Sequence, residues 1–79
     1  MTPTPLTLQQ EAWAEREAGF YDRLVESHKQ MAADYADLHD YERAARVAII
    51  AETYARVADQ LRRPKLIRLE MEEHESRAS

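Results

Sequence analysis

The most constraining feature of the sequence is the stretch from Asp40 to Arg63, DYERAARVAIIAETYARVADQLRR, which contains no glycine and no proline. Most of its residues form helices readily. Asp40 suits the N-cap position, because its carboxylate can accept a hydrogen bond from a free amide of the first turn. Pro64, which follows the stretch, has no N–H to continue the helical bonding. The sequence therefore predicts a helix over residues 40–63.

Two rows of apolar residues follow this helix at alternating spacings of three and four, the pattern of a packed helix. The first row is nearly all alanine and comprises Tyr41, Ala44, Ala48, Ala51, Ala55 and Ala58. The second row has larger side chains and comprises Val47, Ile50, Tyr54, Val57 and Leu61. Small side chains allow a second helix to approach closely. We therefore predict that the alanine row packs inside the chain and that the second row binds a partner.

An earlier amphipathic stretch predicts another helix over residues 8–37. Thr7 and Gln10 have the spacing of a capping box. Gly19 costs about 1 kcal/mol relative to alanine in a helix, yet the apolar pattern keeps its phase across it, which favours one helix over two. The predicted apolar face comprises Trp13, Phe20, Tyr21, Leu24, His28, Met31, Tyr35 and Leu38.

The chain is expected to reverse at Leu38 and His39, with His39 in a left-handed conformation and Asp40 capping the second helix. The fold class is then all-α, an antiparallel helical hairpin. Since neither glycine nor proline is present at the reversal, a single helix through residues 8–63 is the competing interpretation.

The sequence at the two ends of the chain predicts structures that differ from the helical hairpin of residues 7–63. Residues 1–6, with Pro3 and Pro5, predict a flexible arm. In residues 64–79, Ile67, Leu69 and Met71 alternate with charged residues, as in a strand. The same residues form helices well, and Pro64 could occupy a first helical position. We favour a short helix followed by a frayed tail, with an extended segment as the alternative.

Length and composition bound the class of protein. A chain of 79 residues buries a small core, and the absence of cysteine excludes disulfides and cysteine-ligated metals. Oligomerisation is the remaining common source of stability, so we expect the hairpin to complete a bundle with a partner chain or with itself. The start of the sequence has no signal-peptide pattern and no run is long and apolar enough to span a membrane, so a cytoplasmic location is predicted.

Charge is segregated along the chain. Acidic residues dominate residues 1–42 and basic residues dominate residues 43–68, within a net charge of −4. The simpler interpretation is that an acidic helix packs beside a basic one. The alternative is a basic patch for nucleic acid or an acidic partner, made by Arg62, Arg63, Lys65 and Arg68.

No constellation for catalysis, for a cofactor or for a metal is predicted. Ser27 and His28 are neighbours in sequence and point apart on a helix. Glu17 and His28 lack the Glu-x-x-His spacing of di-iron bundles. His28 is instead expected to be partly buried and hydrogen-bonded to a carboxylate or hydroxyl group. A non-enzymatic role follows as the prediction.

The segment from His28 to Arg56 resembles one tetratricopeptide repeat, a helical hairpin with spaced signature positions. Tyr35, Ala44 and Ala51 match that pattern, and Ala32 is small where glycine is usual. The positions that correspond to the pattern are His28, Met31, Ala32, Tyr35, Ala44, Ala48, Ala51 and Arg56. The resemblance implies a protein-interaction scaffold that needs a neighbour to cover its faces.

The leading functional hypothesis is therefore a small interaction module that acts through its helices, as a homodimeric bundle or as an adaptor or inhibitor of a larger complex. One alternative is an inhibitor of a host defence complex, encoded by a phage or mobile element. Another is an accessory protein that binds nucleic acid through the Arg62–Arg68 patch.

Overall fold

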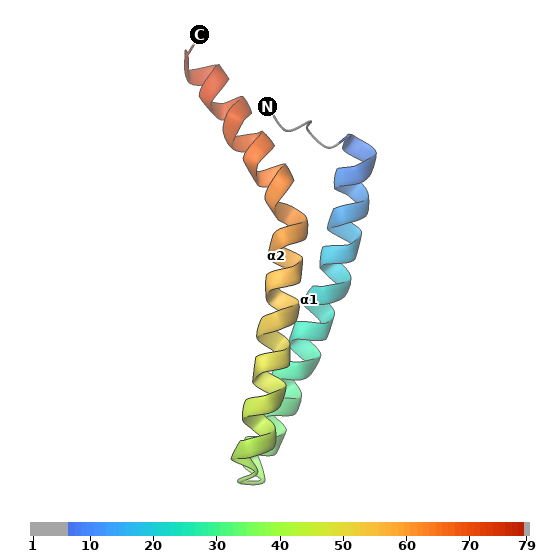
Figure 1. The fold of residues 1–79 in the computed structure, drawn as a ribbon, viewed down its shortest axis with the longest axis vertical. Helices are drawn as coiled ribbons and strands as arrows, with labels where there is room; N and C mark the ends of the chain where they lie inside the picture. Colours follow the sequence, from blue (N-terminus) through green and yellow to red (C-terminus); the bar gives the residue numbers. More distant parts are fainter. Residues whose placement is uncertain (1–6, 79) are drawn as a thin grey trace.

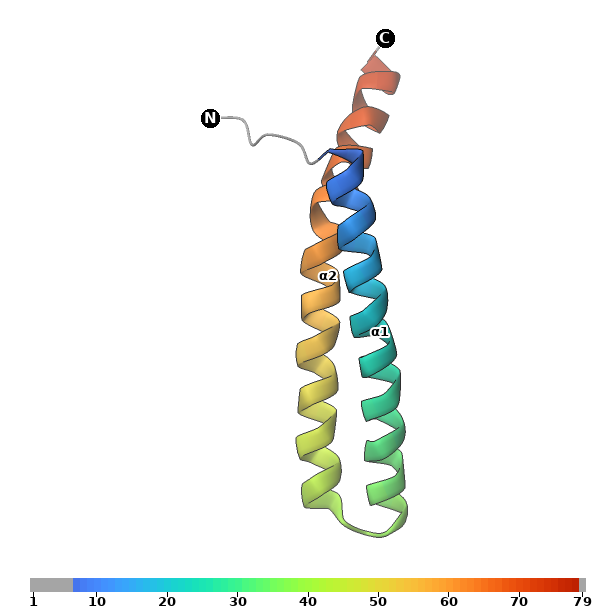
Figure 2. The ribbon, with the colours of Figure 1, turned by 90° about the vertical axis from the view of Figure 1, so that its right-hand side faces the viewer.

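The structure is a two-helix hairpin (Figure 1). The computed structural model describes residues 7–78, which form α1 (Leu8–Asp37) and α2 (Tyr41–Ala78) and contain no strand. The helices run antiparallel side by side, as both views show (Figures 1 and 2). The predicted all-α hairpin is thus confirmed. The arm predicted for residues 1–6 and the last residue of the predicted tail lie outside the described residues.

Helix α1 begins with the predicted capping box. The Gln10 N–H donates to Thr7 Oγ1 at 3.1 Å, and the Thr7 N–H donates to Gln10 Oε1 at 2.9 Å. These bonds satisfy two amide donors that a helix start leaves without partners. The helix continues unbroken through Gly19, as the phase of the pattern predicts.

The reversal between the helices is a tight motif closed by backbone hydrogen bonds. His39 has φ 61°, and its N–H donates to the Ala36 carbonyl while the Asp40 N–H donates to the Tyr35 carbonyl, both at 2.9 Å. This bonding pattern is the Schellman motif, in which the left-handed residue lets the chain leave the helix. Asp40 Oδ1 then accepts the Arg43 N–H at 3.2 Å and caps α2. Both predictions for the reversal are confirmed, and the single helix through residues 8–63 is wrong.

Helix α2 is longer than predicted, because it does not end at Pro64. It continues through Pro64 to Ala78, so residues 65–78 are a bent continuation of the same helix. Pro64 lacks the N–H that would bond the Gln60 carbonyl, and such a loss kinks a helix without necessarily ending it. Beyond this point α2 leans away from α1 (Figure 1). The boundary predicted at residue 63 is therefore wrong, and the strand alternative for the C-terminal segment is excluded.

A narrow seam of small residues joins the helices. Ala18 is fully buried, and Ala51 and Ala58 are each 3% exposed. Because so many of these side chains end at a methyl group, the two backbones can come close together. The seam repeats every seven residues and comprises Glu11, Ala14, Ala18, Tyr21, Val25, His28, Ala32 and Tyr35 of α1 with Ala44, Val47, Ala51, Tyr54, Ala58 and Leu61 of α2, all buried or half-buried.

The seam combines alternate members of the two rows predicted for α2. The prediction that the alanine row alone packs inside the chain, and the second row against a partner, is therefore wrong. Ala48 and Ala55 of the alanine row are exposed, whereas Val47, Tyr54 and Leu61 of the other row are half-buried against α1. The apolar face predicted for α1 is also wrong in part. Two of its large residues lie outside the seam, since Trp13 is 53% and Phe20 50% exposed. Two helices share only one line of contact, and the small residues occupy it because they permit the closest approach.

Candidate functional site

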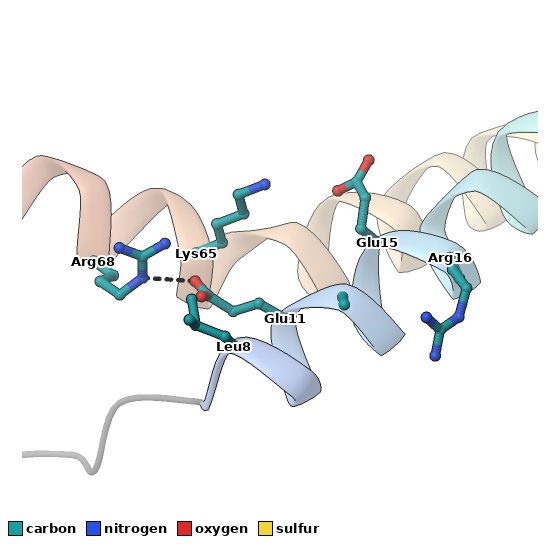
Figure 3. Close-up of a pocket in the computed structure, with 7 residues that line it drawn as sticks. Leu8, Glu11, Glu15, Arg16, Lys65 and Arg68 are labelled. Atoms are coloured by element: carbon teal, nitrogen blue, oxygen red, sulfur yellow. Dashed lines mark hydrogen bonds and ion pairs between the residues drawn. The ribbon is translucent and has the colours of Figure 1, made fainter.

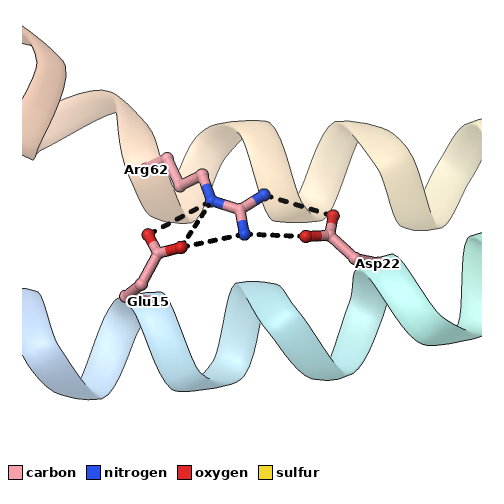
Figure 4. Close-up of polar contacts among 3 residues, drawn as sticks. All are labelled: Glu15, Asp22 and Arg62. Atoms are coloured by element: carbon pink, nitrogen blue, oxygen red, sulfur yellow. Dashed lines mark hydrogen bonds and ion pairs between the residues drawn. The ribbon is translucent and has the colours of Figure 1, made fainter.

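One side of the hairpin is held together by the charges that the sequence segregates. The Arg62 guanidinium lies between two carboxylates of α1 (Figure 4). Its Nη2 donates to Glu15 Oε1 at 3.0 Å and to Asp22 Oδ2 at 2.7 Å. Its Nε donates to Glu15 and its Nη1 to Asp22, so all three guanidinium nitrogens bond to these two carboxylates. Hydrogen bonds from Arg62 lower the pKa of both carboxyl groups below their ordinary values.

A second ion pair joins the helices beyond the bend. Arg68 Nε donates to Glu11 Oε1 at 2.7 Å (Figure 3). Arg68 Nη1 also donates to Glu72 Oε1 at 2.6 Å. Glu11 is only 6% exposed, so this carboxylate needs the charged partner that Arg68 supplies. The bonds to Glu11 and Glu72 raise the pKa of Arg68. This contact helps to hold the segment after Pro64 against the first turns of α1.

The predicted basic patch is therefore largely occupied within the chain. Arg62 and Arg68 bind α1 carboxylates, as the interpretation of complementary helices expects, while Arg63 and Lys65 remain exposed. Lys65 is close enough to Glu15 to help lower its pKa. Sequence reasoning did not identify Glu11, Glu15 and Asp22 as the partners. The segregation of charge indicated only that some such pairing exists.

Loss of these ion pairs on acidification is expected to weaken the hairpin. The pKa values of Glu15 and Asp22 lie below their ordinary 4.5 and 3.8 in the folded chain, so the stabilisation is present at neutral pH and is lost as the pH falls through the folded values. Urea unfolding of the wild type should therefore show a free energy of unfolding that falls below about pH 5. For Arg62→Gln the free energy of unfolding should fall less steeply with decreasing pH. Arg56→Gln, which changes an exposed arginine of α2, is the control. Equal slopes for Arg62→Gln and the wild type would contradict the assignment.

Shallow grooves flank the seam on this charged side. One groove of about 580 Å³ lies at the open end of the hairpin between Leu8, Glu11 and Lys65, with the Glu11–Arg68 ion pair in its wall (Figure 3). A second groove of about 390 Å³ lies over Ala48, Ala51 and Ala55. Both carboxylates of the first groove are already bound by arginines of α2, and the second groove is lined mainly by alanine. Neither groove brings together groups that would bind a small molecule strongly.

His28 has a structural role in the seam. Its Nδ1 lies 2.7 Å from the Leu24 carbonyl, and its ring packs against Tyr54 with centroids 5.3 Å apart. The predicted partner, a carboxylate or hydroxyl group, is therefore wrong, because the carbonyl four residues earlier is within reach of the ring on the same helix. Within residues 7–78 no three histidine, aspartate or glutamate side chains gather as metal ligands. The described helices also include none that is long and apolar enough to cross a membrane.

The opposite side of the hairpin carries an apolar surface. Glu15, Asp22 and Arg62 each directly follow a seam residue, whereas Leu24, Met31, Ile50 and Val57 each directly precede one. In an antiparallel pair, residues that follow seam positions on both helices lie on one side of the seam, and residues that precede seam positions lie on the other. Leu24, Met31, Ile50 and Val57 therefore lie on the side opposite the charged residues. Trp13 and Phe20 extend this surface on α1, one helical turn from Glu17 and Leu24. We define the apolar face as Trp13, Phe20, Leu24, Met31, Ile50 and Val57.

The predicted partner-binding residues divide between the seam and the apolar face. Val47, Tyr54 and Leu61 belong to the seam and are half-buried within one chain. Val57 is half-buried on the apolar face, and Ile50 is 42% exposed there. The apolar face also includes Trp13, Phe20 and Met31, which the sequence analysis placed on the apolar side of the first helix and did not name as partner-binding residues. The spacing of these residues predicted one apolar stripe on α1. It could not predict which side of α1 would pack against the alanines of α2.

Comparison of the chain with family models, curated proteins and solved structures finds no match. The resemblance to a tetratricopeptide repeat accordingly stays a prediction.

Proposed function

We propose that this chain is a non-enzymatic interaction module that binds a partner protein through its apolar face. The observation that carries the proposal is the reversal of the usual distribution of side-chain size. Four of the five buried apolar residues in the described part of the chain are alanines, while large apolar residues such as Trp13, Phe20 and Ile50 remain about half exposed. Extended apolar surface on a small protein marks a binding site far more often than a scattered exposed residue does.

The composition of the apolar face suits protein binding. Tryptophan contributes more than most residues to the energy of protein interfaces, and Trp13 is an exposed indole on a rigid helix. Half-buried Leu24 and Val57 continue the apolar surface down to the seam. A partner helix laid along this side would cover the face and complete a bundle. An adaptor or an inhibitor of a larger complex would use the same surface.

Sedimentation at micromolar concentration tests the proposal through Ile50→Asp. We expect the wild type to sediment above the monomer mass and the variant to sediment as a monomer, because association would bury an unpaired carboxylate. That cost corresponds to an affinity loss of at least about 100-fold.

Ile49→Asp is the matched control, since Ile49 is the next residue, is 62% exposed and points away from the apolar face. The control should keep the wild-type mass. A wild-type chain that is a folded monomer, unchanged by Ile50→Asp, would contradict the proposal.

Nucleic-acid binding has less support. Only Arg63 and Lys65 of the four predicted basic contacts are exposed, because Arg62 and Arg68 bind carboxylates of the same chain. Phosphate contacts would have to compete with these ion pairs.

A further inference from the structure

We infer that the partner at the apolar face is a second copy of this chain, turned end for end so that α1 lies antiparallel on α1. The inference rests on the proposed function and specifies its partner and geometry. A two-fold axis perpendicular to the helices relates the copies, so the same surface is used twice. The result is a four-helix bundle in which each α2 also lies along α2 of the other copy.

Two pairs of apolar residues on α1 and its C-cap place the two-fold axis at the same point along the helix. If Phe20 of one copy lies opposite Met31 of the other, then Trp13 lies opposite Leu38 in the same register. Both pairs have their midpoint between Val25 and Glu26. All four of these side chains are exposed in one copy, from Met31 at 40% to Leu38 at 75%. One placement therefore covers Trp13, Phe20 and Met31 of α1, together with Leu38 at its C-cap, in pairs.

The residues of α2 place the axis at the same height. Ile50 would lie opposite Val57, and their midpoint falls between Thr53 and Tyr54. Tyr54 packs against both Tyr21 and His28, with ring centroids 5.8 Å and 5.3 Å apart. Its level on α1 is therefore midway between those two residues, beside Val25. A single axis satisfies both helices, although nothing in the packing of one copy requires this agreement.

Charge complementarity selects the antiparallel arrangement over the parallel one. Arg16 and Arg23 lie in the first half of α1 along the edge of the apolar face, and Asp34 and Asp37 lie in the second half. End-for-end pairing in this register brings Arg16 of each copy level with residue 35 of the other, between Asp34 and Asp37, whereas parallel pairing opposes like charges. Arg23 comes level with His28 and contributes less. Among the described contacts, none joins these four side chains to α2. Glu17 comes level with Asp34 of the second copy, and the adjacent Arg16 offsets that repulsion.

A charge-reversal pair tests this arrangement. One variant carries Arg16→Glu with Arg23→Glu, and the other carries Asp34→Arg with Asp37→Arg. Each alone should self-associate about 10-fold more weakly than the wild type in sedimentation equilibrium at low salt, since position 16 of each copy then faces like charges at positions 34 and 37 of the other. An equimolar mixture should form a one-to-one heterodimer more tightly than either variant self-associates, because position 16 of each chain then again faces charges of opposite sign at positions 34 and 37.

A control separates position from net charge. Arg56→Glu with Arg63→Glu makes the same change of charge as the first variant on the outer surface of α2 and should leave the wild-type affinity. Circular dichroism of each variant checks that the hairpin is folded. Reversed variants that still self-associate as well as the wild type, or a mixture that fails to pair, would overturn the antiparallel inference. The effect of Ile50→Asp would then still stand for the proposed function, whereas a monomeric wild type would remove both.

Discussion

Replacing Ala18 by leucine is expected to lower the free energy of unfolding by about 2–3 kcal/mol, a large change for a domain of this size. Ala18 is 0% exposed and belongs to the seam, in which Ala14 and Ala58 are also buried. Three further carbon atoms can fit there only if the two backbones move apart. The separation would also loosen the packing of Ala51 and Ala58 along the same line. Urea denaturation followed by circular dichroism measures the change.

Ala33→Leu is the matched control for this substitution, because Ala33 is exposed on the same helix. Leucine and alanine differ little in helix propensity, so the control should change the stability by less than about 0.5 kcal/mol. Equal losses in the two variants would show that Ala18 does not lie in a close-packed seam.

Replacing Pro64 by alanine is expected to raise the free energy of unfolding by about 2 kcal/mol. A proline inside a helix costs about 3 kcal/mol relative to alanine, and part of that cost is already relieved by the bend. The variant restores a donor for the Gln60 carbonyl and favours a straighter α2. Amide hydrogen exchange after residue 64 should slow, since the helix there would open less often.

Arg63→Ala provides the comparison for Pro64→Ala. Arg63 is the preceding residue, is exposed, and has nearly the helix propensity of alanine, so its replacement should leave the stability within about 0.5 kcal/mol. If Pro64→Ala lowered the stability instead, the bend itself would contribute to the stability of the fold.

Local features of the fold could be predicted because short-range chemistry decides them. Thr7 and Gln10 form their capping box from a four-residue pattern, and His39 with Asp40 reverses the chain through bonds to residues of the preceding turn. The end of α2 could not be placed, because proline weakens a helix without always stopping it. Arg68 and Glu11 are far apart in sequence, so their contact gave no local signal for the continuation.

The assignment of faces needed information that a single helix does not contain. Trp13 and Phe20 look like core residues by size, yet they remain outside, because the seam forms where both helices offer small side chains. Segregated charge predicted that acidic and basic helices pack together. It could not say that Arg62 would take two carboxylates at once, since that depends on how the two helices are aligned.

The methyl-lined seam also has a consequence for natural variation. At Ala14, Ala18, Ala51 and Ala58, selection can accept only the smallest residues, because the volume there is set by the distance between two backbones. The side-chain volume of residues on the outer surface is not limited in this way. Change over generations would therefore leave the hairpin itself nearly constant and concentrate on the surface that determines its associations.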